Sequence, residues 1–351
     1  MELGPCDGVC VLGGGTAFPR EVLSNEQVLR NLPASARAHR ATPVTDEELR
    51  FVARGVEESL GVRSRAWAHR VGAPLDPAGT ESTLTLGTQA ARAALADAGC
   101  TIDQISLILC ATSTPHRMTS TLSAAIGAEL GAHCAAMDTR TGCSAGLFAL
   151  ATGALYLNAG AERVLVIGAE TFSKIIPPEH KVAALSLGDG AGALVLGRRA
   201  GARLDAAYLQ TDGSLGKLIT TDGALPPTEA EIARGGYRLS GQPDELLAVV
   251  PHKYEEALGH VLARAGLRAD QIDLFVPHQT SRTLIAEVCR RVGVPLERAF
   301  VNVDRHANIG AAGWLVALVE ARAEGRVPPG TRLALAAVGG GMSWAAAVLT
   351  C

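Results

Sequence analysis

Aromatic side chains are scarce in this chain of 351 residues, since phenylalanine, tryptophan and tyrosine together make up 4%. Hydrophobic residues nevertheless reach 48%, so alanine, valine, leucine and isoleucine must build the core. Glycine is abundant, at 39 residues, and with alanine it favours closely packed layers of helix and sheet. A chain of this length can bury one large core or two halves that share one.

The chain also lacks an excess of basic residues, a long apolar run and a leader segment. Its formal net charge is −3, which gives no attraction for nucleic acid or for an acidic membrane surface. No stretch reaches the ~18 apolar residues that a membrane span requires. The first residues carry neither the basic region nor the apolar segment of a secretory signal. We therefore expect a cytoplasmic protein with no membrane and no nucleic-acid partner.

The eight cysteines lack the pattern of a disulfide framework or a metal site. They lie far apart, at positions 6, 10, 100, 110, 134, 143, 289 and 351, with no CxxC pair and no cysteine–histidine cluster at zinc spacing. We expect reduced thiols, no metal and no cofactor.

Short apolar runs alternate with longer alanine-rich stretches. The runs predict buried strands at 9–12, 107–111, 164–167, 193–196, 274–276, 333–338 and 345–349. The longer stretches predict helices at 84–98, 144–159, 254–265, 283–292 and 311–323. This alternation predicts an α/β fold with sheets covered by helices on both faces. Residues 33–60 and 212–245 are richer in charge, proline and turn residues, and we expect them to form surface excursions.

The chain contains a long internal repeat. The segment "ADAGCTIDQISLILCATS", from Ala96, matches "ARAGLRADQIDLFVPHQT", from Ala263, at an offset of 167 residues. The same offset pairs "TGCSAGLFAL" with "NIGAAGWLVA". A unit this long is no solenoid repeat; it indicates one α/β unit that was duplicated. We predict two halves, residues 1–198 and 199–351, packed face to face.

Two glycine-rich segments invite a phosphate-loop interpretation. "LGGGT" at 12–16 and "GDGAG" at 188–192 lack the spacing of a dinucleotide or Walker loop. We interpret both as tight structural turns, the first after a strand and the second before one.

Cys143 lies in "DTRTGCSAGLFAL", where small residues flank the cysteine and a long apolar stretch without charge or proline follows. A helix N-terminus stabilises a thiolate and lowers the pKa of a cysteine. We interpret Cys143 as a nucleophile at the start of a buried helix. The alternative is one more buried thiol, the commoner fate of a free cysteine.

His278 and Asn308 are the other candidate residues. His278 ends the predicted strand in "DLFVPH", and Asn308 precedes the apolar helix of the second copy. Taken singly, His278 could be a structural hydrogen-bonding residue and Asn308 a helix N-cap. Because strand carboxyl ends and helix N-termini meet at one edge of an α/β sheet, the three residues could converge on one cleft. Cysteine with histidine and asparagine is an arrangement used for acyl chemistry.

The order of these motifs resembles that of β-ketoacyl-ACP synthase III-type enzymes of the thiolase superfamily. The resemblance covers nearly the whole chain and rests on "TGCSAGLFAL", "LGDGAGALVLG", "VPHQ", "VDRHANIGAAG" and "VGGGMSW". It implies a thiolase-like five-layer αβαβα fold built from two pseudo-duplicated halves, and usually a homodimer. It also implies an acyltransferase that condenses an acyl-cysteine with a thioester on acyl carrier protein (ACP), in fatty-acid, polyketide or other specialised metabolism.

The resemblance further implies roles for individual residues. Cys143 takes the acyl group from a thioester carrier. His278 and Asn308 hydrogen-bond the carbonyl of the second thioester and stabilise the enolate that forms on loss of CO2. The N–H groups of Cys143 and Gly340 form the oxyanion hole, and glycine at 339–341 lets the backbone approach the thioester.

Several positions depart from the fatty-acid members of the family. Gly55 and Ser59 stand where those enzymes hold coenzyme A with a tryptophan and an arginine. Lys174 keeps the charge of a third nucleotide contact, and Thr283 replaces a basic carrier-docking residue with Arg282 one position earlier. We assign Lys174 and Arg282 to substrate binding and expect ACP thioesters to be preferred over coenzyme A thioesters.

The loop "STPHRMTS" at 113–120 is the last departure. In the family this loop reaches across the dimer to shape the acyl pocket, and here Met118 or Thr119 replaces a phenylalanine. We assign Met118 and Thr119 to substrate binding.

Other reactions stay open at this point. The chain could join two acyl chains without decarboxylation, or transfer an acyl group to an alcohol or amine. A papain-like hydrolase also uses cysteine, histidine and asparagine, but the repeat and the "VGGG" terminus argue against it. A non-catalytic partner subunit is disfavoured because the cysteine is kept.

Overall fold

The computed structural model describes residues 1–37, 45–74 and 81–351. The strands are β1 Glu2–Leu3, β2 Cys6–Ala17, β3 Glu21–Ser24, β4 Ser64–Trp67, β5 Leu107–Ala111, β6 Ala135–Thr139, β7 Val164–Thr171, β8 Asp189–Thr211, β9 Ile219–Thr221, β10 Leu239–Gly241, β11 Leu274–Pro277, β12 Arg332–Gly339 and β13 Ser343–Thr350. The α-helices are α1 Asn25–Asn31, α2 Ala34–Arg37, α3 Asp46–Leu60, α4 Thr83–Asp97, α5 Leu122–Leu130, α6 Ala145–Asn158, α7 Lys181–Ser186, α8 Glu229–Ala233, α9 Pro243–Ala265, α10 Arg282–Val292, α11 Val303–His306 and α12 Gly313–Ala323.

One mixed sheet carries the fold. Its strand order is β11-β12-β13-β8-β7-β5-β6, and β1 and β2 also pair with β8. Residues 189–196 of β8 pair with β7, and residues 203–211 pair with β13. The long strand β8 therefore joins the strands of the first half to those of the second. The predicted boundary between residues 198 and 199 falls inside it.

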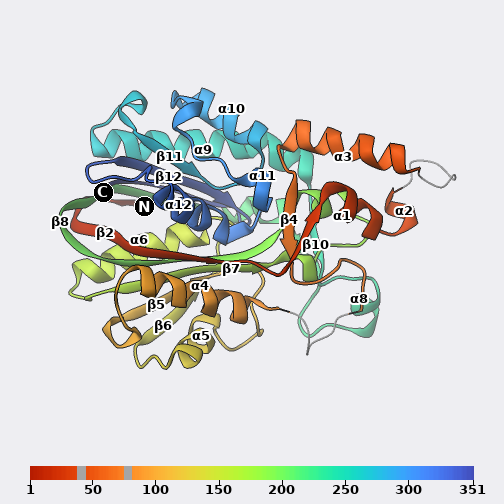
Figure 1. Cartoon of the computed structure of the whole chain (residues 1–351), viewed down its shortest axis with the longest axis horizontal. Helices are drawn as coiled ribbons and strands as arrows, with labels where there is room; N and C mark the ends of the chain where they lie inside the picture. Colours follow the sequence, from red (N-terminus) through yellow and green to blue (C-terminus); the bar gives the residue numbers. More distant parts are fainter. Residues whose placement is uncertain (38–44, 75–80) are drawn as a thin grey trace.

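Helices α6 and α12 fill the middle layer. α6 contacts β5 and β7 as well as β12 and β13, and α12 contacts β2, β8 and β11. Both helices are apolar on nearly all sides, as expected of helices buried between two layers. On the outer faces, α9 packs on β8 and β13 with α10 beside it, and α4 and α5 cover β2, β5 and β6. Figure 1 shows this α/β/α/β/α order from top to bottom, which confirms the predicted fold class.

The predicted strands and helices are all present, and several further elements were not predicted from the sequence, among them β6, α5 and α3. β6 lies at the edge of the sheet and contains no fully buried residue, so it lacks the apolar run of an interior strand. α5 precedes it. α3 lies within the expected surface excursion at 33–60; it begins at a capping box between Thr45 and Glu48 and ends at Gly61 in the left-handed conformation.

The glycines at 12–16 do not form the predicted turn. They lie inside β2, where a Cβ on Gly13 would sit 2.3 Å from the amide nitrogen of Ala98 and one on Gly15 would sit 2.4 Å from the carbonyl oxygen of Ala90. Only glycine lets α4 pack this closely on the strand. The segment is therefore a site of helix–strand contact.

The repeat corresponds to equivalent local structure. A 3₁₀ turn at Ile102–Gln104 precedes β5, and a second at Ala269–Gln271 precedes β11. In both copies the strand begins three residues after the turn ends. The division into two duplicated halves stays our proposal, and these matching turns support it.

Within the described ranges, no helix is long and apolar enough to cross a membrane. The same ranges contain no cluster of three or more histidine, cysteine, aspartate or glutamate side chains able to hold a metal ion. All eight cysteines lie in described segments and are free thiols.

Candidate active site

Cys143 lies in a tight turn between β6 and α6. Gly142 has a φ of 56°, in the left-handed region. The hydroxyl of Ser144 donates to the carbonyl oxygen of Thr141 at 2.7 Å, and the amide of Ala145 donates to the carbonyl oxygen of Gly142 at 3.0 Å. Because α6 begins at Ala145, Cys143 stands just before the N-terminus of a buried helix, where the sequence interpretation placed it.

The turn packs against the glycines at the end of β12 and directly after it. A Cβ on Gly142 would lie 2.3 Å from the amide nitrogen of Gly340, and a Cβ on Gly339 would lie 2.3 Å from the amide nitrogen of Cys143. Both distances are too short for any side chain, so glycine is required on each segment. The two amides expected to form an oxyanion hole thus belong to backbone segments in direct contact.

Burial dominates the electrostatics of the Cys143 thiol. Desolvation, with a smaller contribution from the negative charge of Glu170, raises the pKa of Cys143 to about 12. The N-terminus of α6 favours the thiolate, but desolvation is the stronger effect. The sequence-based expectation of a lowered pKa is therefore wrong for this environment, and Cys143 is a thiol at neutral pH.

His278 follows β11 directly and is buried, with 1% of its surface exposed. Neither ring nitrogen has a hydrogen-bond partner among the described residues. A Cβ on Gly313 would lie 3.1 Å from Nδ1, so the ring faces the start of α12. Desolvation lowers the pKa of His278 to about 4, which keeps the imidazole neutral at pH 7. A buried, unpartnered polar ring is costly unless a ligand supplies the missing bond.

Asn308 is fixed by its backbone and by its side-chain oxygen. Its amide donates to the carbonyl oxygen of Ser186 at 2.9 Å, and its carbonyl oxygen accepts from the amide of Gly188 at 3.0 Å. Oδ1 accepts from the amide of Gly310 at 2.9 Å. The side-chain NH2 group is then the part left to donate to a substrate. Asn308 is not the N-cap of α12, which begins at Gly313.

The residue before Asn308 has an unusual backbone conformation. Ala307 is fully buried with a φ of 56°, a region that costs a residue with a side chain roughly 1–3 kcal/mol. Such strain persists only where the surrounding structure enforces it. The local backbone is thus held in one conformation immediately before the predicted catalytic asparagine.

The starts of the two central helices bring these segments together. A Cβ on Gly146 of α6 would lie 3.0 Å from the carbonyl oxygen of Ala311 and 2.6 Å from Nε1 of Trp314. Gly146 and Gly313 are equivalent positions in the repeat. The Cys143 turn therefore adjoins the segment that follows Asn308. In this segment, Gly313 lies against the ring of His278.

A cavity of about 320 Å³ opens beside Cys143. Its walls come from the ends of β5 and β6, the turn after β7, the glycines at 340–341, and residues 216–221 and 239. The segment 212–245, which the sequence predicted as a surface excursion, thus forms part of the site. Its walls include Phe172, Ile175, Ile219 and Leu239, which suit the apolar part of a small acyl group.

Glu170 is a buried carboxylate that the sequence reasoning missed. It accepts hydrogen bonds from the hydroxyl of Thr114 at 2.6 Å, the amide of Ser113 at 2.9 Å and the amide of Ala311 at 3.3 Å. It therefore links the loop at the cavity wall to the segment after Asn308. The only sequence signal was a single charge at the end of the apolar run "VLVIGAE".

Glu170→Gln should change how stability depends on pH. Burial raises the pKa of Glu170 from 4.5 to about 7. The folded state therefore binds this proton more tightly than the unfolded state does. The resulting stabilisation of ~3 kcal/mol is fully present below pH ~4.5 and is lost as the pH rises through ~7. Urea unfolding gives the free energy of unfolding of both proteins at pH 5 and pH 8. The value for wild type minus the value for the variant should be about 2 to 3 kcal/mol lower at pH 8 than at pH 5.

Two other buried groups also make stability depend on pH, so wild type has to be compared with the Glu170→Gln variant. Burial also raises the pKa of Asp189, to about 6, with the same sign. The lowered pKa of His278 acts oppositely, because stability there rises with pH. Both groups remain in the variant, so the difference between the two proteins isolates Glu170. An unchanged difference at the two pH values would contradict the assignment.

Four predicted substrate-binding residues lie outside the walls of the Cys143 cavity. Met118 is 70% exposed and Thr119 is also exposed. Lys174 is half-buried, and its Nζ donates to the carbonyl oxygen of Glu81 at 2.6 Å. The roles of these residues and of Arg282 stay predictions.

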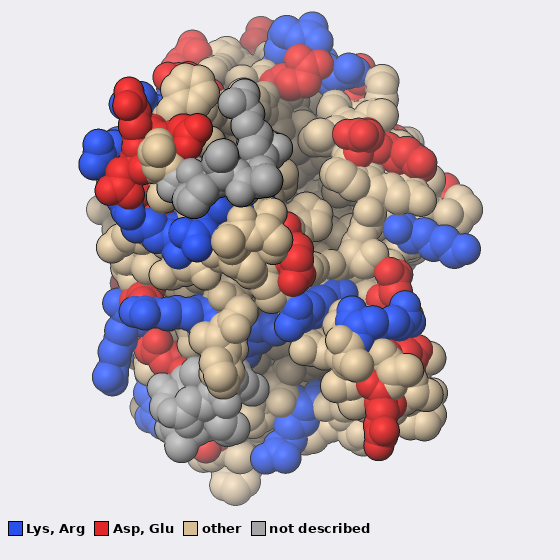
Figure 2. All heavy atoms as spheres, turned by 90° about the vertical axis from the view of Figure 1, so that its right-hand side faces the viewer, with Lys and Arg blue, Asp and Glu red and all other residues tan. Residues whose placement is uncertain are grey.

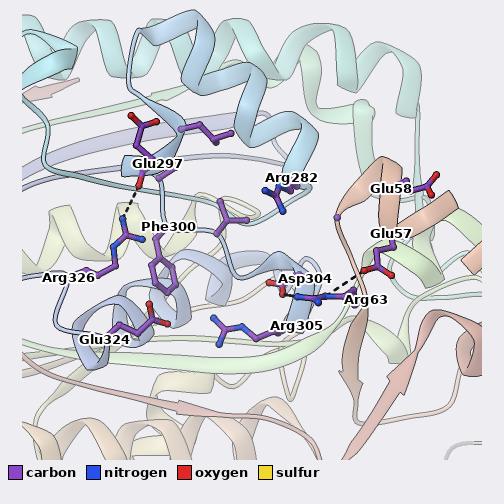
Figure 3. Close-up of a pocket in the computed structure, with 14 residues that line it drawn as sticks. Glu57, Glu58, Arg63, Arg282, Glu297, Phe300, Asp304, Arg305, Glu324 and Arg326 are labelled. Atoms are coloured by element: carbon purple, nitrogen blue, oxygen red, sulfur yellow. Dashed lines mark hydrogen bonds and ion pairs between the residues drawn. The ribbon is translucent and has the colours of Figure 1, made fainter. Parts of the chain in front are cut away.

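Arg282 lines a second, larger cavity of about 910 Å³ between α3, α10 and α11 (Figure 3). Most arginines in this cavity are engaged. Arg63 pairs with Asp304, and the guanidinium of Arg326 lies over the ring of Phe300, 5.5 Å from its centroid. Arg282 itself makes no hydrogen bond or ion pair with the described residues. Figure 3 shows it at the start of α10, opposite Arg63 and Asp304.

The expected coenzyme A positions lie on α3. The hydroxyl of Ser59 donates to the carbonyl oxygen of Gly55 at 2.6 Å, and a Cβ at Gly55 would meet nothing within 4 Å. Positions 55 and 59 themselves therefore offer neither an aromatic face nor a cation to a nucleotide.

Comparisons with known proteins agree with this geometry. Residues 137–213 match the family model for 3-oxoacyl-[acyl-carrier-protein (ACP)] synthase III, and residues 262–351 match the model for its C-terminal part. Over 343 residues the chain is 36% identical to a β-ketoacyl-[acyl-carrier-protein] synthase III of Rhizorhabdus wittichii, covering 97% of this chain and 98% of that protein.

Solved structures of β-ketoacyl synthases also match this chain over nearly its whole length. The crystal structure of 3-oxoacyl-[acyl-carrier-protein] synthase III from Aquifex aeolicus VF5 matches with a TM-score of 0.83 at 27% identity, covering 98% of this chain and 100% of the other. The priming β-ketosynthase of the R1128 polyketide biosynthetic pathway matches with a TM-score of 0.82 at 26% identity, covering 99% and 97%.

Proposed function

The chain belongs to the β-ketoacyl-[acyl-carrier-protein] synthase III family, and from this membership we propose that it condenses an acyl group held on Cys143 with a malonyl- or β-ketoacyl thioester on ACP. The enzyme is an acyltransferase that forms carbon–carbon bonds by Claisen condensation, as in fatty-acid or polyketide synthesis. One observation supports the assignment of Cys143 most directly. Cys143 lines a cavity of about 320 Å³, and its amide lies against the glycine backbone at 339–340.

In the first half-reaction the sulfur of Cys143 attacks the thioester carbonyl of the acyl carrier. The bond from the carbonyl carbon to the carrier sulfur breaks, and the thiol proton passes to the departing sulfur. The N–H groups of Cys143 and Gly340 stabilise the oxyanion between these steps. This stabilisation matters because burial raises the pKa of Cys143 to about 12, so a free thiolate is rare before substrate binds.

In the second half-reaction the malonyl thioester loses CO2, and the electrons of that bond form an enolate. His278 and Asn308 donate hydrogen bonds to the enolate oxygen. The carbanion attacks the acyl carbonyl, the bond to Cys143 breaks, and the departing thiolate takes up a proton from solvent. Since the lowered pKa of His278 keeps its ring neutral, both donors are neutral groups aimed at developing negative charge.

The same residues argue against acyl transfer to an alcohol or amine. A neutral amide at position 308 can donate to a thioester oxygen, whereas an ionised carboxylate there could only accept. Joining two chains without decarboxylation would use the same donors, and the mass of the product distinguishes it from the decarboxylative reaction.

The carrier is proposed to be ACP. Figure 2 shows a broken band of lysine and arginine side chains across the middle of the face formed by the right-hand side of Figure 1, which suits an acidic carrier protein. Gly55 and Ser59 provide no stacking surface and no cation for the adenine and 3′-phosphate of coenzyme A. Arg282, free of a partner among the described residues, is proposed to meet the carrier.

Acylation of Cys143 should therefore be more than ~100-fold faster from acyl-ACP than from the matching acyl-coenzyme A. The two missing contacts are each on the order of 1–3 kcal/mol, and ~3 kcal/mol is more than a hundredfold. The double variant Gly55→Trp/Ser59→Arg should speed acylation by acyl-coenzyme A. The matched control is Gly259→Trp, because Gly259 of α9 has the same open surroundings. Equal wild-type rates with the two carriers would overturn the preference.

We also propose a homodimer and a cytoplasmic location. Among the described residues, the edge strand β6 has a strand partner on one side only. The exposed Met118 lies in the loop that reaches across the dimer in related enzymes. The eight free thiols support a reducing compartment.

A further inference from the structure

One arginine in the wall of the Cys143 cavity has no role in the mechanism above. Arg140 follows β6 directly and lies three residues before the nucleophile. It is one of the residues that line the 320 Å³ cavity. Within the described residues its guanidinium makes no ion pair and no hydrogen bond.

The cavity also offers Arg140 no counter-charge. None of the described residues that line it is an aspartate or a glutamate. Glu170, which accepts a hydrogen bond from the amide of the wall residue Ser113, also accepts from Thr114 and Ala311. Two arginines of the larger cavity differ, since Arg63 pairs with Asp304 and Arg305 pairs with Glu320.

The cavity wall also contains two threonine side chains from β9. Thr220 and Thr221 lie in its wall on β9. Phe172 and Ile219 add apolar surface to the same cavity as Cys143. Among the described residues, the walls thus combine apolar side chains, threonine hydroxyls and one unpaired cation, which suit an acyl chain that ends in an anionic group.

We propose that the acyl group loaded onto Cys143 carries a carboxylate at its far end and that Arg140 binds this carboxylate. The enzyme would then take the half-thioester of a small dicarboxylic acid in preference to a neutral acyl chain. A guanidinium and a carboxylate form a paired, charge-assisted contact. The carboxylate takes no part in bond making or breaking; it selects the substrate. This inference rests on the proposed role of Cys143 as the acylated residue.

The test measures acylation of Cys143 alone, by mass spectrometry, with succinyl and butyryl thioesters on the same ACP and no malonyl thioester present. Wild type should be acylated by the succinyl thioester at least tenfold faster. Arg140→Leu should lose this preference, and Arg140→Lys should restore part of it. Arg264→Leu is the matched control, because Arg264 is an exposed arginine on α9 outside the cavity.

The outcomes separate this inference from the proposed function. Faster acylation of wild type by the butyryl thioester, or an Arg140→Leu variant with the wild-type ratio, would overturn the inference and leave the function intact. An effect of Arg140→Leu confined to the step that consumes malonyl thioester would also overturn it, since Arg140 would then bind the carboxylate that is lost as CO2. No adduct on Cys143 from either thioester would instead contradict the proposed function.

Discussion

Replacing Cys143 with alanine should lower the rate of condensation on the order of 10⁴-fold or more, because the acyl group loses its covalent attachment. Removing a nucleophile leaves only the contributions of substrate binding and oxyanion stabilisation. The backbone of the turn should persist, since it is fixed by the glycine contacts at 142 and 339 and by the Ser144 hydroxyl. Product formation from an acyl-ACP and malonyl-ACP, followed by mass spectrometry, gives the rate.

The matched control for this variant is Cys134→Ala. Cys134 is a half-buried free thiol whose pKa burial also raises, but it lies outside the walls of the Cys143 cavity. Cys134→Ala should condense within a few-fold of wild type. A Cys143→Ala protein that keeps a tenth of the wild-type rate would mean that another group carries the acyl chain.

Asn308→Asp should separate the two half-reactions. An aspartate can keep the hydrogen bond that Oδ1 accepts from the amide of Gly310, so the local backbone should be retained. It cannot donate to the enolate oxygen while ionised, and its charge opposes the developing negative charge. We expect acylation of Cys143 to stay within a few-fold of wild type and condensation to fall by ~10³-fold.

Two rates from one set of samples check this prediction. Intact-mass measurement gives the acylation rate without malonyl thioester, and product formation gives the condensation rate with it. A variant that condenses normally would show that Asn308 does not stabilise the enolate. Loss of both rates together with a lowered unfolding free energy would point to a structural role for the residue.

The sequence predicted the interior of this fold well and its edge poorly. Interior strands such as β5 and β7 are runs of buried apolar residues, and such runs are visible without a structure. β6 is an edge strand with no fully buried residue, so its sequence carries no comparable run. The glycines at 12–16 suggested a turn because their function, contact with the backbone of α4, depends on a helix some eighty residues away.

The candidate site divides in the same way. Cys143, His278 and Asn308 were recognisable because each lies at a strand or helix boundary in a distinctive local segment. Glu170 and Arg140 were not, because each matters through what surrounds it. Glu170 is notable for its burial and its contact with Ala311, and Arg140 for the absence of an acid in the described cavity wall. The raised pKa of Cys143 likewise follows from burial, which a sequence does not report.

The most direct test of the proposed mechanism is to isolate the acyl-enzyme, map its adduct and then chase it. The protein is incubated with an acyl-ACP, one portion is digested and its peptides are mapped, and the other portion receives malonyl-ACP. The acyl mass should lie on the peptide that contains Cys143, and the chase should remove it as β-ketoacyl-ACP appears in equal amount with release of CO2. An adduct on Cys110 or Cys134, or an adduct on Cys143 that survives the chase while product forms, would contradict the mechanism.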